Sequence, residues 1–456
     1  MKNTSYRTAS YSSPSLRATV ITATSALLSL LLSSHASALD YTLDVRLLAE
    51  SSDNVNREHR SMEQDELETR LGTTLGVTHE GRKVSVDLNY SASASDYKND
   101  VVQSDTEIIG NSNVVWDIIN ESLRWNFNHD ISETLANNRV SDARDNRETR
   151  QTFRTGPEYT ARLTSVDDLI LALEYTSITQ DSAESETATS RSNIDSQRGE
   201  ASVTWSHALS RASAFELGYS NLRTEFDNDS PDFEYQQIFV GYNVLLSSGS
   251  YGIRIGANRS ERENQDDDQN GVYASANFTR NFGAHGIVLG AVRQLTDSSV
   301  GLDSSIDQFS SNNFSEIAVV ERTSFNANYR YDNLCSGCTL ELSYLYDKED
   351  FQQDNVSAIS PNDDSEDNRF EGSIRYRANS KLSGRGFVSY LLTDFNTDNR
   401  EDTTSEIGFS IDYLLTQDLT LSFFGSYEER DTKIDAPVDL DYNVHTASIG
   451  AVYRIH

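Results

Sequence analysis

Residues 410–431, SIDYLLTQDLTLSFFGSYEERD, alternate apolar and polar side chains on both sides of a short polar break at residues 416–418. The apolar positions are Ile411, Tyr413 and Leu415 before the break and Leu419, Leu421, Phe423 and Tyr427 after it. A period of two predicts β-strands with two unlike faces, and the tight break predicts that the two strands form a hairpin.

The same alternation recurs along the chain in about twenty segments, including residues 84–90 (VSVDLNY) and 338–346 (CTLELSYLY). The links between these segments alternate in length. Short links occur near Gly81 and Gln417, whereas residues 51–66 and 349–368 are long acidic links. Short turns on one side and long polar loops on the other are typical of bacterial outer-membrane barrels. A soluble β-sandwich does not sort its loops by length so regularly.

We therefore expect an all-β fold, an antiparallel transmembrane β-barrel of about 20 strands (18–22), with short periplasmic turns and long acidic extracellular loops. Backbone amides in hydrocarbon must pair internally, and strands achieve this only in a closed sheet. The apolar face of each strand would then contact lipid and the polar face would line an aqueous lumen. The expected location is the outer membrane of a Gram-negative bacterium.

The N-terminus has the features of a secretory signal peptide. Lys2, Arg7 and Arg17 precede the apolar run at residues 18–34, and small residues stand at Ala36 and Ala38. This pattern predicts cleavage after Ala38, a signal peptide at residues 1–38 and a barrel at residues 39–456. A transmembrane anchor is the weaker interpretation, because the run is short and ends in small polar residues.

The chain is strongly acidic, with 71 Asp and Glu against 38 Lys and Arg and a net charge of −33. This charge argues against nucleic acid as a partner. The expected partners are outer-membrane lipid, lipopolysaccharide, a polysaccharide and periplasmic export components. No cofactor or metal is expected, since DDDQNG (residues 266–271) matches only half of a calcium loop. G-x-S-x-G and H-E-x-x-H are both absent, so an enzyme is not expected, although a hydrolase with scattered residues stays open.

Three features resemble a family of β-barrel porins associated with exopolysaccharide biosynthesis and export genes. Asp53-Asn54-Val55 follows the first expected strand, hairpins of the type Y-x-L-x-x-D-L-x-L occur at residues 413–421, and the last strand reads DYNVHTASIGAVYRI. The resemblance covers the whole mature chain through short motifs. It implies an exit passage through the outer membrane for a secreted polysaccharide, without catalytic residues.

Five acids are predicted on the lumen face at similar heights near the short turns: Asp44, Asp87, Glu216, Glu341 and Asp412. A ring of acids would form a collar that favours cations and hydrogen-bonds sugars. The alternative is that these positions are acidic only because the lumen must be polar, and this simpler interpretation is favoured.

A local group of arginines stands out in the acidic chain, and on the predicted lumen face it comprises Arg124, Arg150, Arg154 and Arg162. Such a ladder would bind an anionic sugar, because guanidinium pairs well with carboxylate and sulfate. Pairing with lumen acids such as Glu158 and Glu174, which would stiffen the wall, is the favoured alternative.

Cys335 and Cys338 form a lone C-x-x-C. Without a second ligand pair or a βαβ context, a disulfide across one turn is expected rather than a zinc or redox site. The functional hypotheses are a polysaccharide exit passage, a general or cation-selective diffusion porin, and a structural or adhesive barrel acting through its acidic loops.

Overall fold

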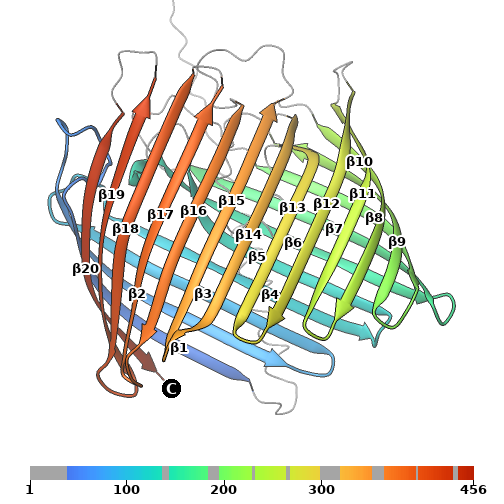
Figure 1. Cartoon of the computed structure of the whole chain (residues 1–456), viewed down its shortest axis with the longest axis horizontal. Helices are drawn as coiled ribbons and strands as arrows, with labels where there is room; N and C mark the ends of the chain where they lie inside the picture. Colours follow the sequence, from blue (N-terminus) through green and yellow to red (C-terminus); the bar gives the residue numbers. More distant parts are fainter. Residues whose placement is uncertain are drawn as a thin grey trace, which may run out of the picture. The chain divides into compact units, whose positions relative to one another are not determined.

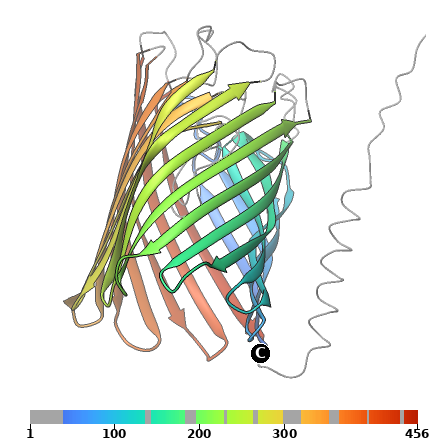
Figure 2. The same cartoon turned by 90° about the vertical axis from the view of Figure 1, so that its right-hand side faces the viewer.

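The computed structural model describes residues 39–135, 143–182, 195–227, 232–262, 268–297, 319–351, 364–396, 399–434 and 440–455. The predicted signal peptide lies outside these ranges. Residues Tyr41–His456 form one compact unit. Its twenty strands form a single antiparallel sheet in which each strand pairs with the next and β1 pairs with β20, so the sheet is a closed barrel (Figures 1 and 2).

The strands are β1 (Asp40–Ser52), β2 (Glu66–Glu80), β3 (Val84–Tyr97), β4 (Asp105–Ile119), β5 (Leu123–Leu135), β6 (Arg147–Arg162), β7 (Asp167–Ser182), β8 (Ser196–Ala208), β9 (Ser213–Phe226), β10 (Phe233–Leu246), β11 (Gly249–Arg262), β12 (Gln269–Phe282), β13 (His285–Asp297), β14 (Val319–Cys335), β15 (Cys338–Phe351), β16 (Ser365–Arg377), β17 (Leu382–Phe395), β18 (Arg400–Leu414), β19 (Leu419–Lys433) and β20 (Tyr442–Ile455). A 3₁₀ turn, η1 (Arg144–Asn146), precedes β6. Within the described ranges, no helix has the length and apolarity needed to cross a membrane.

The links between strands sort by length, which confirms the predicted fold class. The links that follow even-numbered strands contain two to four residues, and we call this rim the short-turn end. The links that follow odd-numbered strands contain four to 21 residues, and we call that rim the long-loop end. The C-terminus lies at the short-turn end (Figure 1). The hairpin predicted for residues 410–431 is β18–β19, in which Ile411 pairs with Phe423 and Tyr413 pairs with Leu421.

The outward face of the barrel is apolar. Ile253 and Ile255 of β11 are 51% and 57% exposed, and Ile407 and Phe409 of β18 are 58% and 53% exposed. Exposed aromatic side chains on this face occur within four residues of the short-turn end on many of the strands, among them Tyr41, Trp116, Tyr159, Tyr242, Tyr251, Phe282, Tyr376, Tyr413, Phe423 and Tyr453. An apolar band bordered by aromatic residues is the surface that a barrel presents to a bilayer and its interface.

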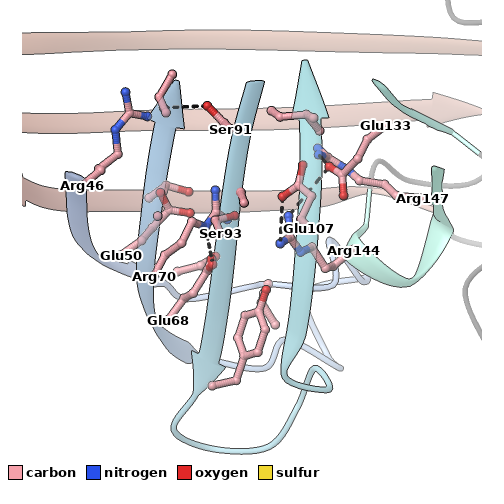
Figure 3. Close-up of a pocket in the computed structure, with 18 of the residues that line it drawn as sticks. Arg46, Glu50, Glu68, Arg70, Ser91, Ser93, Glu107, Glu133, Arg144 and Arg147 are labelled. Atoms are coloured by element: carbon pink, nitrogen blue, oxygen red, sulfur yellow. Dashed lines mark hydrogen bonds and ion pairs between the residues drawn. The ribbon is translucent and has the colours of Figure 1, made fainter. Parts of the chain in front are cut away.

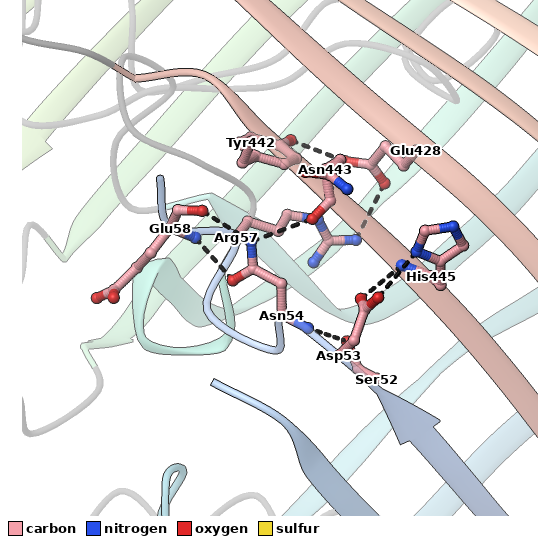
Figure 4. Close-up of polar contacts among 9 residues, drawn as sticks. All are labelled: Ser52, Asp53, Asn54, Arg57, Glu58, Glu428, Tyr442, Asn443 and His445. Carbon is pink, nitrogen blue, oxygen red and sulfur yellow. Dashed lines mark hydrogen bonds and ion pairs between the residues drawn. The ribbon is translucent and has the colours of Figure 1, made fainter. Parts of the chain in front are cut away.

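The barrel closes where two segments from opposite ends of the sequence meet (Figure 4). The backbone N–H of His445 in β20 donates to Asp53 Oδ1 at 2.7 Å, and the His445 ring Nδ1 lies 2.8 Å from Asp53 Oδ2. Asn54 is fully buried, and its Nδ2 donates to the Asn443 carbonyl at 3.2 Å. The two terminal motifs that carry the family resemblance therefore contact each other at the β1–β20 seam.

A second set of contacts holds the link between β1 and β2 against the same seam. Arg57 Nε and Nη2 donate to the two carboxylate oxygens of Glu428 in β19, at 3.1 and 3.2 Å. The Tyr442 hydroxyl donates to Glu428 Oε1 at 2.7 Å (Figure 4). These charge-assisted bonds tie the link to β19 and β20.

A small apolar cluster lies at the long-loop end, where β13 and β14 approach β9 and β10. It consists of Leu222, Phe226, Phe233, Leu295 and Val319, with Tyr235 packed against it. A Cβ atom added at Gly271 would lie 2.7 Å from Leu295 Cγ, so this glycine leaves the space that Leu295 fills. Strict outward placement of apolar residues therefore breaks down at this cluster, and Phe239 of β10 also lines the lumen.

Candidate lumen lining

The strands place all five predicted collar acids on the lumen face near the short-turn end. Asp44, Asp87, Glu216, Glu341 and Asp412 each lie within five residues of the short-turn end of their strand. On each strand, the neighbouring residues in sequence belong to the outward face, because side chains alternate along a strand.

Basic and hydroxyl side chains contact most of these acids. Arg454 of β20 donates from Nε and Nη2 to Asp44 at 3.0 and 3.1 Å. Arg254 of β11 donates in the same way to Glu216 Oε2, at 3.3 and 3.2 Å. The Ser422 hydroxyl donates to Asp412 Oδ1 at 2.8 Å. The acids are thus interleaved with arginines around the lumen, and a role as a cation collar remains a prediction.

Three arginines on neighbouring strands interrupt the row of acids, and they are not among the lumen residues predicted from the sequence. Arg375 and Arg377 lie at the short-turn end of β16, and Arg385 of β17 is the register partner of Arg375. All three side chains are exposed. Two short motifs in the sequence indicate them. R-Y-R at residues 375–377 places two arginines on the same polar face of a strand, and G-R-G at residues 384–386 follows after the four-residue link between β16 and β17.

The predicted basic ladder lies on β5 and β6. Arg124 Nε lies 3.3 Å from Glu158 Oε1, and Arg162 Nε lies 3.4 Å from Asp168 Oδ1. Arg150 is 7% exposed, and Arg154 lines a lumen cavity with Glu174. The two ion pairs agree with the wall-stiffening interpretation for Arg124 and Arg162, and binding of an anionic sugar by the ladder stays a prediction.

A network of alternating charges extends over β1–β5, η1 and the start of β6 on the lumen side near the long-loop end (Figure 3). It lines a cavity of about 430 Å³. Arg70 Nε donates to Glu68 Oε1 at 2.7 Å, and Arg147 Nη1 donates to Glu133 Oε2 at 3.0 Å. Arg144 Nη2 lies 4.0 Å from Glu107 Oε2. These charges largely neutralise one another.

Two more groups of ion pairs lie near the long-loop end on β14–β19, and both are buried. Arg322 Nε donates to Asp347 Oδ1 at 2.9 Å. Arg400 Nε and Nη2 donate to the two oxygens of Asp402 at 3.0 and 2.8 Å, and Arg430 also donates to Asp402. Arg400, Asp402 and Arg430 are each at most 6% exposed.

The wall formed by β10–β14 combines aromatic rings with amide side chains. It lines a cavity of about 790 Å³ whose lining includes Phe239, Tyr273, Gln237, Asn277 and Asn326. The rings of Phe239 and Tyr273 lie 6.0 Å apart, and the Arg254 guanidinium lies 5.2 Å from the Phe239 ring centre.

Cys335 and Cys338 are joined by a disulfide across the two-residue link between β14 and β15. Across the described ranges, no three or more His, Cys, Asp or Glu side chains are arranged to hold a metal ion. Two residues of the half calcium loop, 266 and 267, lie outside those ranges, and its described residue Asp268 pairs with Arg259.

No family model matches the chain, and no curated protein matches it either. Among solved structures, the siderophore receptor PirA from Acinetobacter baumannii has a TM-score of 0.51 at 8% identity, over 92% of this chain and 81% of that chain. PirA from Pseudomonas aeruginosa has a TM-score of 0.46 at 11% identity, over 93% and 81%. OccAB2 from Acinetobacter baumannii has a TM-score of 0.38 at 12% identity, over 91% and 98%.

The chain is an outer-membrane β-barrel. At such low identities the comparison with PirA from Acinetobacter baumannii concerns the fold alone. The closed antiparallel sheet and the apolar outward face agree with an outer-membrane barrel fold, because a barrel without edges is the form in which strands span a membrane.

Proposed function

We propose that the barrel is a passage through the outer membrane for a secreted polysaccharide, and that it acts by the shape and polarity of its lumen without bond chemistry. The observation that supports this proposal best is the lumen wall on β10–β14, where aromatic rings and amide side chains line one cavity of about 790 Å³.

Such a wall suits a sugar polymer for a physical reason. A pyranose ring presents an apolar C–H face and a rim of hydroxyl groups. The apolar face packs on an aromatic ring such as that of Phe239, because burying both surfaces removes them from water. The amides of Gln237, Asn277 and Asn326 supply both donors and acceptors for the hydroxyl rim. Several weak contacts of this kind retain a polymer without trapping it, which conduction requires.

The second candidate is a general or cation-selective diffusion porin, and the paired charges weigh against its cation-selective form. A selective pore needs a ring of charge with one sign. In this lumen, Asp44 and Glu216 are each bonded to an arginine, and three further arginines lie at the same rim. Opposite charges at these distances cancel much of each other's field.

Two measurements test the proposal. Liposomes containing the purified barrel should pass neutral oligosaccharides well above the size admitted by a general diffusion pore, and deletion of the gene should abolish secreted polymer while the polymer is still synthesised. Replacing Phe239 by Ala should slow oligosaccharide passage, whereas Phe409→Ala, which removes an aromatic ring from the outward face, should not. Normal secretion in the deletion strain would refute the proposal.

A further inference from the structure

The arginines at the short-turn end of β16 and β17 carry a further inference. Arg375 and Arg385 are register partners across the β16–β17 ladder, so their side chains leave the sheet side by side on the lumen face. Arg377 lies two residues further along β16, on the same face, because side chains of one face recur at every second position.

This arrangement differs from that of two other lumen-facing arginines near the same rim. Arg454 is bonded to Asp44, and Arg162 lies 3.4 Å from Asp168. Among the residues that the structure describes, Arg375, Arg377 and Arg385 make no ion pair with an acid. On the two flanking strands, the lumen acids Glu341 of β15 and Asp412 of β18 accept from the hydroxyls of Ser373 and Ser422.

Like charges placed directly opposite each other on a sheet destabilise it. A chain with 71 acids could readily supply a neutralising neighbour, as it does for Arg162 and Arg454. Wall stiffening therefore does not explain Arg375 and Arg385. An anion that binds between the two guanidinium groups would remove the repulsion, and guanidinium favours carboxylate and sulfate through paired hydrogen bonds.

Two aromatic rings lie beside this arginine pair, further from the short-turn end. The Arg385 guanidinium lies 5.7 Å from the ring centre of Phe387, and the rings of Phe387 and Phe424 are 6.2 Å apart and nearly parallel, at 14°. A Cβ atom added at Gly408 would lie 2.5 Å from Phe387 Cζ. The Phe387 ring therefore occupies the space that a side chain at position 408 would fill. It packs against the lumen wall and is half-exposed.

We propose that Arg375, Arg385, Phe387 and Phe424 form a binding site for a carboxylate-bearing sugar unit of an anionic polysaccharide at the periplasmic mouth of the lumen. The carboxylate lies between the two arginines and the apolar face of the pyranose packs on the aromatic pair. Arg377 adds positive charge at the rim, where the polymer enters. This inference rests on the proposed function and names its substrate class.

The test uses the full barrel in planar bilayers, with three probes added from the short-turn side: a linear hexamer of galacturonic acid, maltohexaose as its neutral counterpart, and monomeric galacturonate at equal carboxylate concentration. The acidic hexamer should interrupt the ion current at concentrations at least tenfold lower than the other two. Arg375→Gln with Arg385→Gln should raise its half-blocking concentration about ten- to a hundredfold, because two charge-assisted contacts are lost.

Control variants separate the site from general charge effects. Arg211→Gln, in the link between β8 and β9, removes a positive charge from the same rim and should leave the block unchanged. Arg385→Lys keeps the charge but loses the paired geometry, so it should weaken the block by less than Arg385→Gln. Phe387→Ala should weaken the block by maltohexaose and by the acidic hexamer alike. The heat-dependent shift in gel mobility verifies that each variant is folded.

Equal block by the acidic and the neutral hexamer, or an unchanged block in the double arginine variant, would overturn the inference. So would equal block by the monomer, since that would make the site one for small carboxylates. These results would not bear on the passage of oligosaccharides into liposomes, which tests the proposed function separately. Conversely, strong block by the acidic hexamer with no secretion defect on deletion would refute the proposed function and keep the binding site.

Discussion

Replacing Asp402 by Asn should destabilise the barrel strongly while leaving its shape unchanged. Asp402 is 4% exposed and lies between two buried arginines. Arg400 donates to both of its oxygens, at 3.0 and 2.8 Å, and Arg430 donates to Oδ2. Asparagine has nearly the same size, but it has no charge and only one acceptor oxygen.

The magnitude follows from the burial of the arginines. Removing one member of a buried ion group leaves the remaining charges uncompensated, which costs about 3–5 kcal/mol. The matched control is Asp412→Asn in the same strand. Asp412 is half-exposed, and among the described residues its recorded bond is from the Ser422 hydroxyl at 2.8 Å, so its loss should cost about 1 kcal/mol or less.

The assay is unfolding by urea of the barrel refolded in detergent micelles, followed by the fluorescence of its three tryptophans and by gel mobility. The midpoint for Asp402→Asn should fall well below that of Asp412→Asn, with the dependence on urea concentration unchanged, since the same surface is exposed on unfolding. Equal midpoints for the two variants would refute the reasoning, because they would mean that water or other groups compensate Arg400 and Arg430.

Three more predictions follow from individual contacts. Asn54→Ala removes bonds to Glu58 and to the Asn443 carbonyl, so it should lower the free energy of unfolding by roughly 1–3 kcal/mol and speed amide exchange in residues 53–65; unchanged exchange would contradict it. Gly408→Val should displace the Phe387 ring and weaken oligosaccharide block, whereas Gly425→Val beside the outward Phe409 should not; equal effects on block would argue against a lumen platform. If the acids form a cation collar, replacing three of them by Asp87→Asn, Glu216→Gln and Glu341→Gln should lower cation preference in reversal-potential measurements; unchanged selectivity would contradict the collar and agree with the paired charges.

The placement of single residues on faces could be predicted because it depends on local geometry alone. Alternation in residues 410–431 identifies the β18–β19 hairpin, and the same rule places Glu216 and Arg124 on the lumen side. Pairing between residues is different, because it depends on the register of strands that are distant in sequence. Arg254 is 38 residues from Glu216, and nothing local to either position predicts their contact.

The amino-acid sequence by itself determined the fold class, the approximate strand number, the sorting of links by length and the face of each candidate residue. These properties follow from the period of two along each strand and from the need to pair every backbone amide in lipid. Only the tertiary structure decided that Asp53 and Asn54 meet β20, 389 or more residues away, and that Arg375 and Arg385 stand side by side. The physical reason is that closure and register bring together positions whose separation along the chain carries no information about their separation in space.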